Sequence, residues 1–331
     1  MTDALSEVLT YIGVVVVGIL VWAALSPFEV LSWWAGWFGD AIYGETIPTT
    51  TPNADSPPAA SARAESPRPQ AYIVFLSGVA RVSGESFSYR EQDFLRRLAV
   101  ALPTAVIIND IFPYSVNNLP LTGQPFFARL WRFALRSKLS GPGLAGYLIN
   151  LRNIWQVMIS ADKRYGPIFN QAVADVILHT LLRHGYALDQ PTPIFVIGYS
   201  GAGQVSVGAT MYLKEVLHAP VYVVSLGGVF ASDPGVMAAD RVFHIYGTRD
   251  RVHKSGLFAP GRWSIFPGSA WNRAKREGRV EMINVGPLGH TGAGGYLDAK
   301  RHLPNGIAFV DATVACIRKL VETQLALHTP E

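Results

Sequence analysis

From residue 71 onward, the chain alternates short apolar, mostly β-branched runs with longer stretches in which apolar residues recur at helical spacing. Six of the short runs have the length and composition of buried strands. Helices are expected between them, for example at 90–102, and a last helix is expected at 306–327. This alternation is typical of an α/β fold, with a mostly parallel sheet covered by helices on both faces. The predicted strands lie at 71–78, 104–110, 193–198, 221–228, 242–247 and 280–286.

The stretch between the second and third predicted strands, residues 111–190, is longer than one crossover helix needs. It is also rich in aromatic side chains, so we expect a helical cap insertion over the strand ends. Its aromatic residues either line an apolar acyl pocket or only pack the cap helices against the sheet, and the sequence leaves both open. These residues are Phe126, Phe127, Trp131, Tyr147 and Trp155.

The N-terminal part of the chain has a different pattern. The 21 residues between Glu7 and Glu29 carry no charge, and a helix of that length reaches roughly 30 Å, the thickness of a bilayer core. We therefore expect residues 1–44 to form one transmembrane helix followed by a Trp-rich interfacial segment. A cleaved signal peptide and a buried core helix are the alternatives. Residues 45–70 hold six prolines among Ala, Ser and Thr, which predicts a semi-extended linker to a domain at 71–331.

Charge is distributed unevenly along the chain. Of the net charge of +4, residues 1–44 contribute −4, residues 45–70 contribute −1 and the remainder contributes +9. A basic domain of this kind can lie against an anionic membrane surface. No basic run with interleaved aromatics is present, which argues against nucleic acid as a partner. The single cysteine, Cys316, excludes an internal disulfide framework and a cysteine-rich zinc site.

The third predicted strand runs into the sequence GYSGAG, in which Ser200 is surrounded by small residues. Gly198 and Ala202 occupy the two small positions of the G-x-S-x-G pattern, which holds a serine on a sharp strand-to-helix turn. A helix N-terminus beside that serine would stabilise a developing oxyanion. A dinucleotide cradle is the alternative, but it requires an acidic residue at the end of the next strand, and that strand ends in VVSLGGVF.

A nucleophilic serine needs a base that a third group positions. Asp250 follows the fifth predicted strand and His290 follows the sixth. Parallel strands end at one edge of a sheet, so Ser200, Asp250 and His290 are predicted to meet there in the chain order Ser, Asp, His.

Other residues offer substitutes for these partners. Asp233, after the fourth predicted strand, is the alternative acid. His244 and His253 lie closer to Asp250 in sequence, but one falls inside a strand and the other in the following connection, so structural roles are expected for both.

These motifs, in this order and on these elements, resemble the α/β-hydrolase superfamily of serine esterases and lipases. The resemblance implies that Ser200 is the nucleophile, His290 the general base and then acid, and Asp250 the group that orients the imidazole. It also implies an oxyanion hole made by the backbone N–H groups of Gly201 and, in the sequence LSGVA, Val79. The two N-terminal strands common in the family are missing, so a reduced sheet of about six strands is expected.

The resulting hypothesis is a membrane-anchored serine hydrolase that cleaves carboxylic esters or thioesters through an acyl-enzyme and needs no cofactor or metal. Its expected partners are a small-molecule ester or lipid substrate and the membrane lipids around the N-terminal helix. The alternative is a non-catalytic, hydrolase-like accessory subunit of a membrane protein complex. Orientation in the membrane is not predicted, because no Lys or Arg flanks the apolar run.

Overall fold

The structure is a computed structural model that describes residues 30, 31, 34, 35, 68–81, 83, 87–118 and 144–327. The predicted transmembrane run, nearly all of the linker and residues 119–143 of the predicted cap lie outside the described residues. In the described part of the chain, no helix combines the length and the apolar character needed to cross a bilayer. The predicted anchor therefore stays a prediction.

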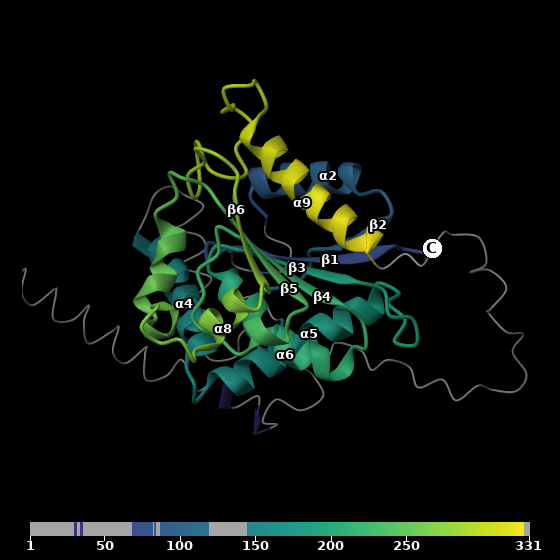
Figure 1. Ribbon diagram of the computed structural model, residues 1–331, viewed down its shortest axis with the longest axis vertical. Coiled ribbons are helices and arrows are strands. Elements are labelled where there is room, and N and C mark those ends of the chain that lie inside the picture. The colour runs from purple at the N-terminus through teal and green to yellow at the C-terminus, as the bar shows by residue number, and fades with distance from the viewer. Residues whose placement is uncertain are drawn as a thin grey trace, which may run out of the picture.

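Six parallel strands form one sheet in the order β2-β1-β3-β4-β5-β6 (Figure 1). Each lies within or next to a stretch that the sequence predicts as a strand, so the predicted mostly parallel sheet of about six strands is confirmed. The strands are β1 (Ala71–Leu76), β2 (Ala105–Ile108), β3 (Ile194–Tyr199), β4 (Val221–Leu226), β5 (Arg241–Tyr246) and β6 (Val280–Asn284).

Helices cover both faces of this sheet, as predicted (Figure 1). One face packs against α2 and α9, and the other against α5 and α6, with α4 next to α6. Two short 3-10 helices, η4 and η5, follow β5. The helices are α2 (Tyr89–Ala101), α4 (Leu144–Ala161), α5 (Gly166–Arg183), α6 (Ala202–Val216), α7 (Gly235–Ala238), η4 (Val252–Phe258), η5 (Pro260–Arg262), α8 (Ala270–Arg276) and α9 (Phe309–Ala326).

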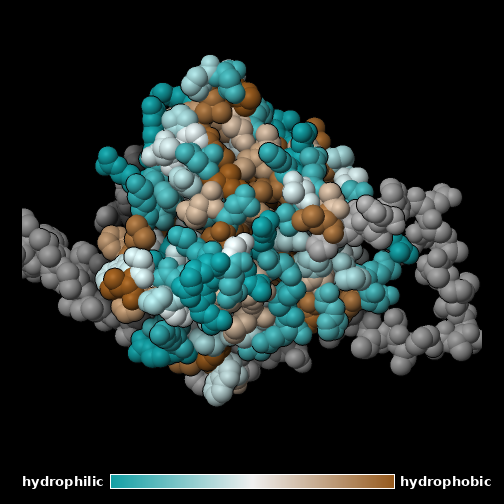
Figure 2. All heavy atoms as spheres, viewed as in Figure 1, coloured by the Kyte–Doolittle hydropathy of each residue, from teal (hydrophilic) through white to brown (hydrophobic). Residues whose placement is uncertain are grey.

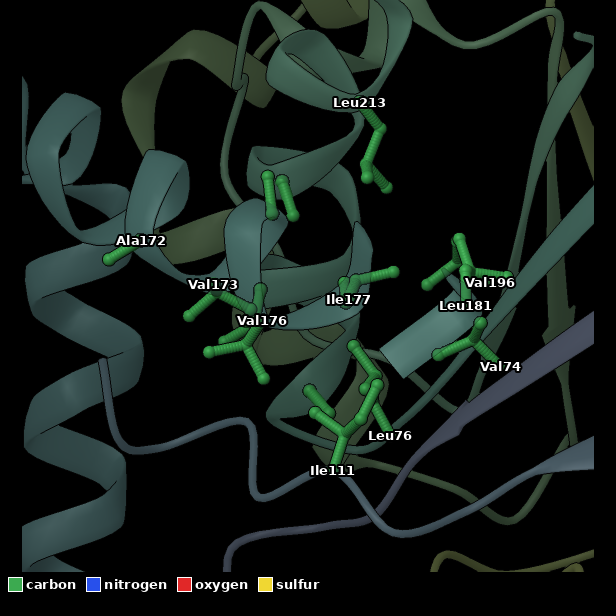
Figure 3. Packing of buried hydrophobic residues seen from close by; sticks show 14 of the residues in the cluster. Val74, Leu76, Ile111, Ala172, Val173, Val176, Ile177, Leu181, Val196 and Leu213 are labelled. Atoms are coloured by element: carbon green, nitrogen blue, oxygen red, sulfur yellow. The ribbon is translucent and has the colours of Figure 1, made fainter. Parts of the chain in front are cut away.

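The buried strands divide their side chains between the two faces with period two. In β1, Val74 and Leu76 point into the cluster that α5 and α6 complete (Figure 3). Ile73 and Phe75 point into the opposite cluster, which α2 and α9 complete. All four side chains are fully buried, so β1 reads as a continuous apolar run instead of an alternating one.

The predicted cap is described only in part. Helices α4 and α5 pack against α6 and against each other. Trp155 of α4 is partly buried against the core cluster on that face, so packing accounts for this aromatic residue. Phe126, Phe127 and Trp131 lie outside the described residues.

Candidate active site

Ser200 occupies the turn between β3, which ends at Tyr199, and α6, which begins at Ala202. Its φ of 57° lies in the left-handed region, which costs a residue other than glycine of order 1–3 kcal/mol. Two backbone hydrogen bonds hold it there: Ser200 N–H donates to Leu226 O at 3.1 Å, and Val229 N–H donates to Ser200 O at 2.9 Å. The neighbouring strand β4 thus stabilises the strained conformation.

The small residues of GYSGAG are required by crowding at this turn. A Cβ at Gly198 would lie 2.5 Å from Ser206 Oγ and 2.6 Å from Ala202 O, and a Cβ at Gly203 would lie 2.8 Å from Gly228 Cα. Such distances are far below van der Waals contact, so side chains here would push helix and strand apart. The glycines therefore permit the close approach of β3 and α6.

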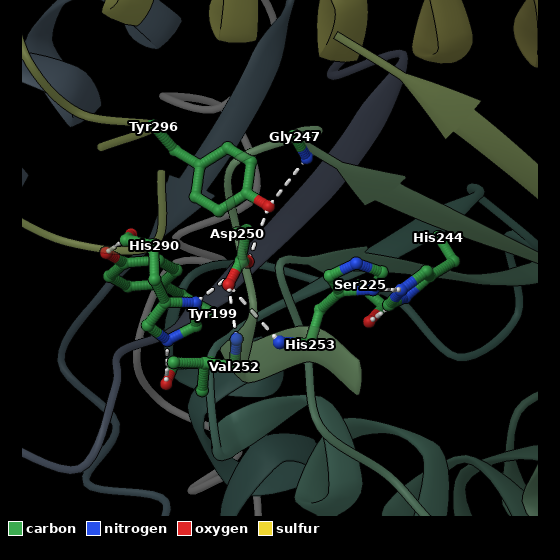
Figure 4. Close-up of polar contacts among 10 residues, drawn as sticks. Tyr199, Ser225, His244, Gly247, Asp250, Val252, His253, His290 and Tyr296 are labelled. Carbon is green, nitrogen blue, oxygen red and sulfur yellow. Dashed lines mark hydrogen bonds and ion pairs between the residues drawn. The ribbon is translucent and has the colours of Figure 1, made fainter. Parts of the chain in front are cut away.

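The structure brings Ser200, His290 and Asp250 together at the carboxyl ends of β3, β6 and β5. Ser200 Oγ lies 2.7 Å from His290 Nε2, and His290 Nδ1 lies 2.9 Å from Asp250 Oδ2 (Figure 4). The Asp250 side chain is fully buried, whereas the His290 side chain is 12% exposed and Ser200 is 8% exposed. These hydrogen-bonded side chains therefore lead from a buried carboxylate to a hydroxyl close to the protein surface.

Hydrogen bonds keep the Asp250 carboxylate charged inside the protein. Tyr296 Oη donates to Asp250 Oδ2 at 2.7 Å, and Val252 N–H donates to Oδ1 at 2.8 Å. Burial opposes ionisation, but the hydrogen bonds from His290 and Tyr296 outweigh it, so the pKa of Asp250 lies below its usual range. Gly247 N–H in turn donates to Tyr296 Oη at 2.9 Å, which fixes the phenol (Figure 4).

A second tyrosine supports the imidazole. Tyr199 Oη donates to the backbone oxygen of His290 at 2.8 Å, and its ring stacks on the imidazole with centroids 5.9 Å apart. Sequence reasoning missed both tyrosines. The position of Tyr199 directly before Ser200 could have indicated that it belongs to the site, but nothing in the sequence indicates a role for Tyr296.

Gly201 and Val79, the predicted oxyanion donors, lie side by side. A Cβ at Gly201 would come within 2.7 Å of Val79 Cγ1 and 3.0 Å of Val157 Cγ2. As far as the described residues go, the N–H groups of Gly201 and Val79 donate to no protein acceptor. Gly201 also precedes the first residue of α6, so the positive end of that helix faces the same place. Two unpaired donors beside Ser200 suit a developing oxyanion.

The loop that carries Val79 is held by Asn153 of α4. The Asn153 side chain is fully buried, and its Nδ2 donates to Val79 O at 2.7 Å and to Arg81 O at 2.8 Å. Tyr114 Oη donates to Ser77 O of the same loop at 2.9 Å. The sequence gives no signal for Asn153, because its partner loop lies more than seventy residues away.

Asp233, the alternative acid, is placed elsewhere. Its carboxylate accepts hydrogen bonds from Gln204 Nε2 at 2.9 Å and Gly235 N–H at 2.8 Å, while Nδ1 of His290 faces Asp250. Burial raises the pKa of Asp233. It therefore holds the turn into α7 against α6 and does not contact the imidazole.

A second serine and histidine pair lies in the strands themselves. Ser225 Oγ is 3.0 Å from His244 Nδ1, and His244 Nε2 is 3.3 Å from His253 Nδ1 (Figure 4). Ser225 and His244 are fully buried, and burial together with nearby Arg262 lowers the pKa of His244 to about 3. A neutral, enclosed imidazole of this kind fits a structural role.

No protein-family model matches the chain, and no curated protein matches it. Among solved structures, it is similar to a variant of SOBER1 from Arabidopsis thaliana, with 16% sequence identity and a TM-score of 0.39 over 77% of this chain and 99% of that chain. The parallel six-stranded sheet, with helices on both faces, fits an α/β-hydrolase fold.

Proposed function

We propose that this chain is a serine hydrolase that cleaves carboxylic esters or thioesters. The observation that carries the proposal is the hydrogen-bonded series from Ser200 Oγ through His290 to Asp250, on a serine with a left-handed φ. A tight turn alone does not require a serine in a left-handed conformation that contacts a histidine. These features together suit a nucleophile.

In the proposed reaction, Ser200 Oγ attacks the carbonyl carbon of the substrate while His290 Nε2 takes the hydroxyl proton. The carbonyl oxygen becomes an oxyanion, to which the N–H groups of Gly201 and Val79 donate. His290 then gives the proton to the departing alcohol or thiol, which leaves an acyl group on Ser200. Water, deprotonated by His290, attacks this acyl-enzyme, releases the acid and restores the hydroxyl of Ser200.

The surroundings of the oxyanion site support an apolar acyl group. The side chains of Val79 and Val157 both reach the space next to Gly201. An anchor in residues 1–44 remains part of the proposal and would keep such an enzyme near lipidic substrates.

A fluorophosphonate probe tests the proposed nucleophile. We expect the full-length protein to be labelled on Ser200, and the Ser200→Ala variant to remain unlabelled, as gel fluorescence and peptide mass spectrometry would show. Ser225→Ala is the matched control, because Ser225 also contacts a histidine but is fully buried; labelling should persist. Failure of the folded protein to react would overturn the enzymatic proposal in favour of a non-catalytic accessory subunit.

Replacing Asn153 with alanine tests the proposed oxyanion loop. The change leaves the carbonyls of Val79 and Arg81 without their side-chain donor, so we expect kcat for an activated ester to fall about 10–100-fold, with KM changed much less. Steady-state kinetics would measure both constants.

Ser160→Ala is the control for general damage to α4. Ser160 Oγ donates a buried hydrogen bond to Asn170 Oδ1 at 2.6 Å, but Ser160 has no contact with the loop at 77–81. Both variants should lose about 1–2 kcal/mol of stability, which thermal melting would compare. Equal kcat values in the two variants would contradict a positioning role for Asn153.

A further inference from the structure

An exposed apolar segment begins two residues after Asp250 and runs through η4 and η5 to the start of the loop before α8. Phe258 is 86% exposed and Ile265 is 71% exposed. Figure 2 shows brown residues gathered at the edge of the molecule where Figure 1 draws this part of the chain. We call this segment, residues 252–266, the apolar rim. Its exposed large apolar members are Val252, Leu257, Phe258, Trp263, Ile265 and Phe266.

The fold holds the apolar rim in this exposed arrangement. Trp263 Nε1 donates to Leu257 O at 2.6 Å, which ties the two ends of the η4–η5 turn together. Asn272 Nδ2 of α8 donates to Trp263 O at 2.7 Å and to Phe266 O at 3.0 Å. The backbone is therefore pinned while the large side chains point outward. Soluble surfaces rarely keep so many large apolar side chains together without a partner.

Positive charge is concentrated in the stretch of chain that contains the apolar rim. Residues 249–276 contain seven Lys or Arg and a single carboxylate, the buried Asp250, whereas the whole chain has a net charge of only +4. Six of the seven cations are exposed, and none of the six forms an ion pair with a carboxylate of the described residues. These six are Arg249, Arg251, Lys254, Arg273, Lys275 and Arg276.

We propose that the apolar rim and these cations form a docking surface for an anionic lipid bilayer. Protein surfaces that insert into the headgroup layer typically combine large apolar side chains, such as Trp, Phe, Ile and Leu, with Lys and Arg. Charge complementarity favours anionic lipid as the occupant, because unpaired cations gain phosphate partners there. Because the apolar rim begins two residues after Asp250, docking would place the end of β5 next to the membrane surface. The surface would act whether or not Ser200 is catalytic.

The test measures the depth of the apolar rim in a bilayer that carries the full-length protein. In a Cys316→Ser background, which removes the single cysteine, Ile265→Cys is labelled with an environment-sensitive NBD fluorophore. The protein is reconstituted in phosphatidylcholine vesicles, with or without about 30% phosphatidylglycerol. Lipids that carry a spin label near the headgroup quench NBD fluorescence when the fluorophore contacts either leaflet. The control carries the same NBD label at Val100→Cys on α2, a site that is 76% exposed.

With phosphatidylglycerol present, we expect NBD at position 265 to shift to shorter emission wavelengths and to be quenched at least about fivefold more than NBD at position 100. Lys254→Glu with Arg273→Glu should weaken this insertion by about tenfold or more. Arg301→Glu with Lys319→Glu changes net charge equally, on exposed residues outside the surface, and should leave insertion unchanged.

Three results would overturn the proposal. The first is equal quenching at positions 265 and 100, which means that the rim stays in water. The second is equal burial of the label in neutral and anionic vesicles, which means that anionic lipid does not cover the apolar rim and points to another segment or a second copy of the chain. The third is an equal effect of both charge-reversed pairs. Hydrolysis of a soluble ester by the same variants, which should not change, separates docking from the proposed function.

Discussion

Replacing His290 with alanine is expected to lower kcat for a small ester by about 10⁴-fold or more. The imidazole is the only titratable group, among the residues described, within hydrogen-bond reach of Ser200 Oγ. Without it, the hydroxyl has no acceptor for its proton and stays a weak nucleophile. Steady-state hydrolysis of an activated ester measures kcat, and fluorophosphonate labelling should be lost in parallel.

His253→Ala is the control for this experiment, because His253 lies close to Asp250 in sequence but its side chain faces His244 and stacks on Tyr246. The substitution keeps the backbone N–H of residue 253, which donates to Asp250 Oδ1 at 3.3 Å. We expect kcat to change by no more than about threefold. A comparable loss in both variants would contradict the assignment of His290 as the base.

The fold could be predicted from the sequence because three central strands, β1, β3 and β4, are buried along their whole length. The run AYIVFL is apolar throughout, and VYVVSL is interrupted only by Ser225, a composition typical of parallel strands. β6 has no buried residue, and Glu281 and Met282 are exposed, yet it follows the same spacing at the edge of the sheet. Strand order is not encoded locally, and the βα alternation predicted only that the strands are mostly parallel.

The three central residues of the candidate site were also predictable, because each lies in the connection that follows a strand, and the strand ends share one edge. Supporting residues were not. Asn153 acts from a helix on a loop, and Tyr296 reaches Asp250 from the irregular segment after β6. Such contacts depend on side-chain directions in the folded chain, and neither residue type nor spacing predicts them.

The motif predicted a sharp turn at Ser200, and the structure shows that its φ is left-handed and what stabilises it. Two hydrogen bonds to the chain at Leu226 and Val229 connect the turn to the end of β4. The same region packs Gly203 against Gly228. The strained serine is therefore supported by the end of the neighbouring strand β4, and the contact of Gly203 with Gly228 gives this glycine after β4 a role that the sequence alone left unexplained.

The environment of Asp250 determines what its amide variant can do. Oδ1 accepts from the backbone N–H groups of Val252 and His253, and Oδ2 accepts from His290 Nδ1 and Tyr296 Oη. In Asp250→Asn, the carboxamide oxygen is expected to stay with the two backbone donors, so the NH₂ group faces His290. It would donate to Nδ1 and turn the imidazole into the tautomer that carries its proton on Nε2, toward Ser200.

We therefore expect Asp250→Asn to lower kcat by about 10⁴-fold while the protein stays folded, as hydrolysis assays and thermal melting would show. Asp233→Asn is the matched control: it also replaces a buried carboxylate, but one that contacts Gln204 and Gly235 and not the imidazole. Its kcat should stay within about threefold of the unaltered protein. The opposite ranking of the two variants would identify Asp233 as the functional acid and would require that His290 change partners during the reaction.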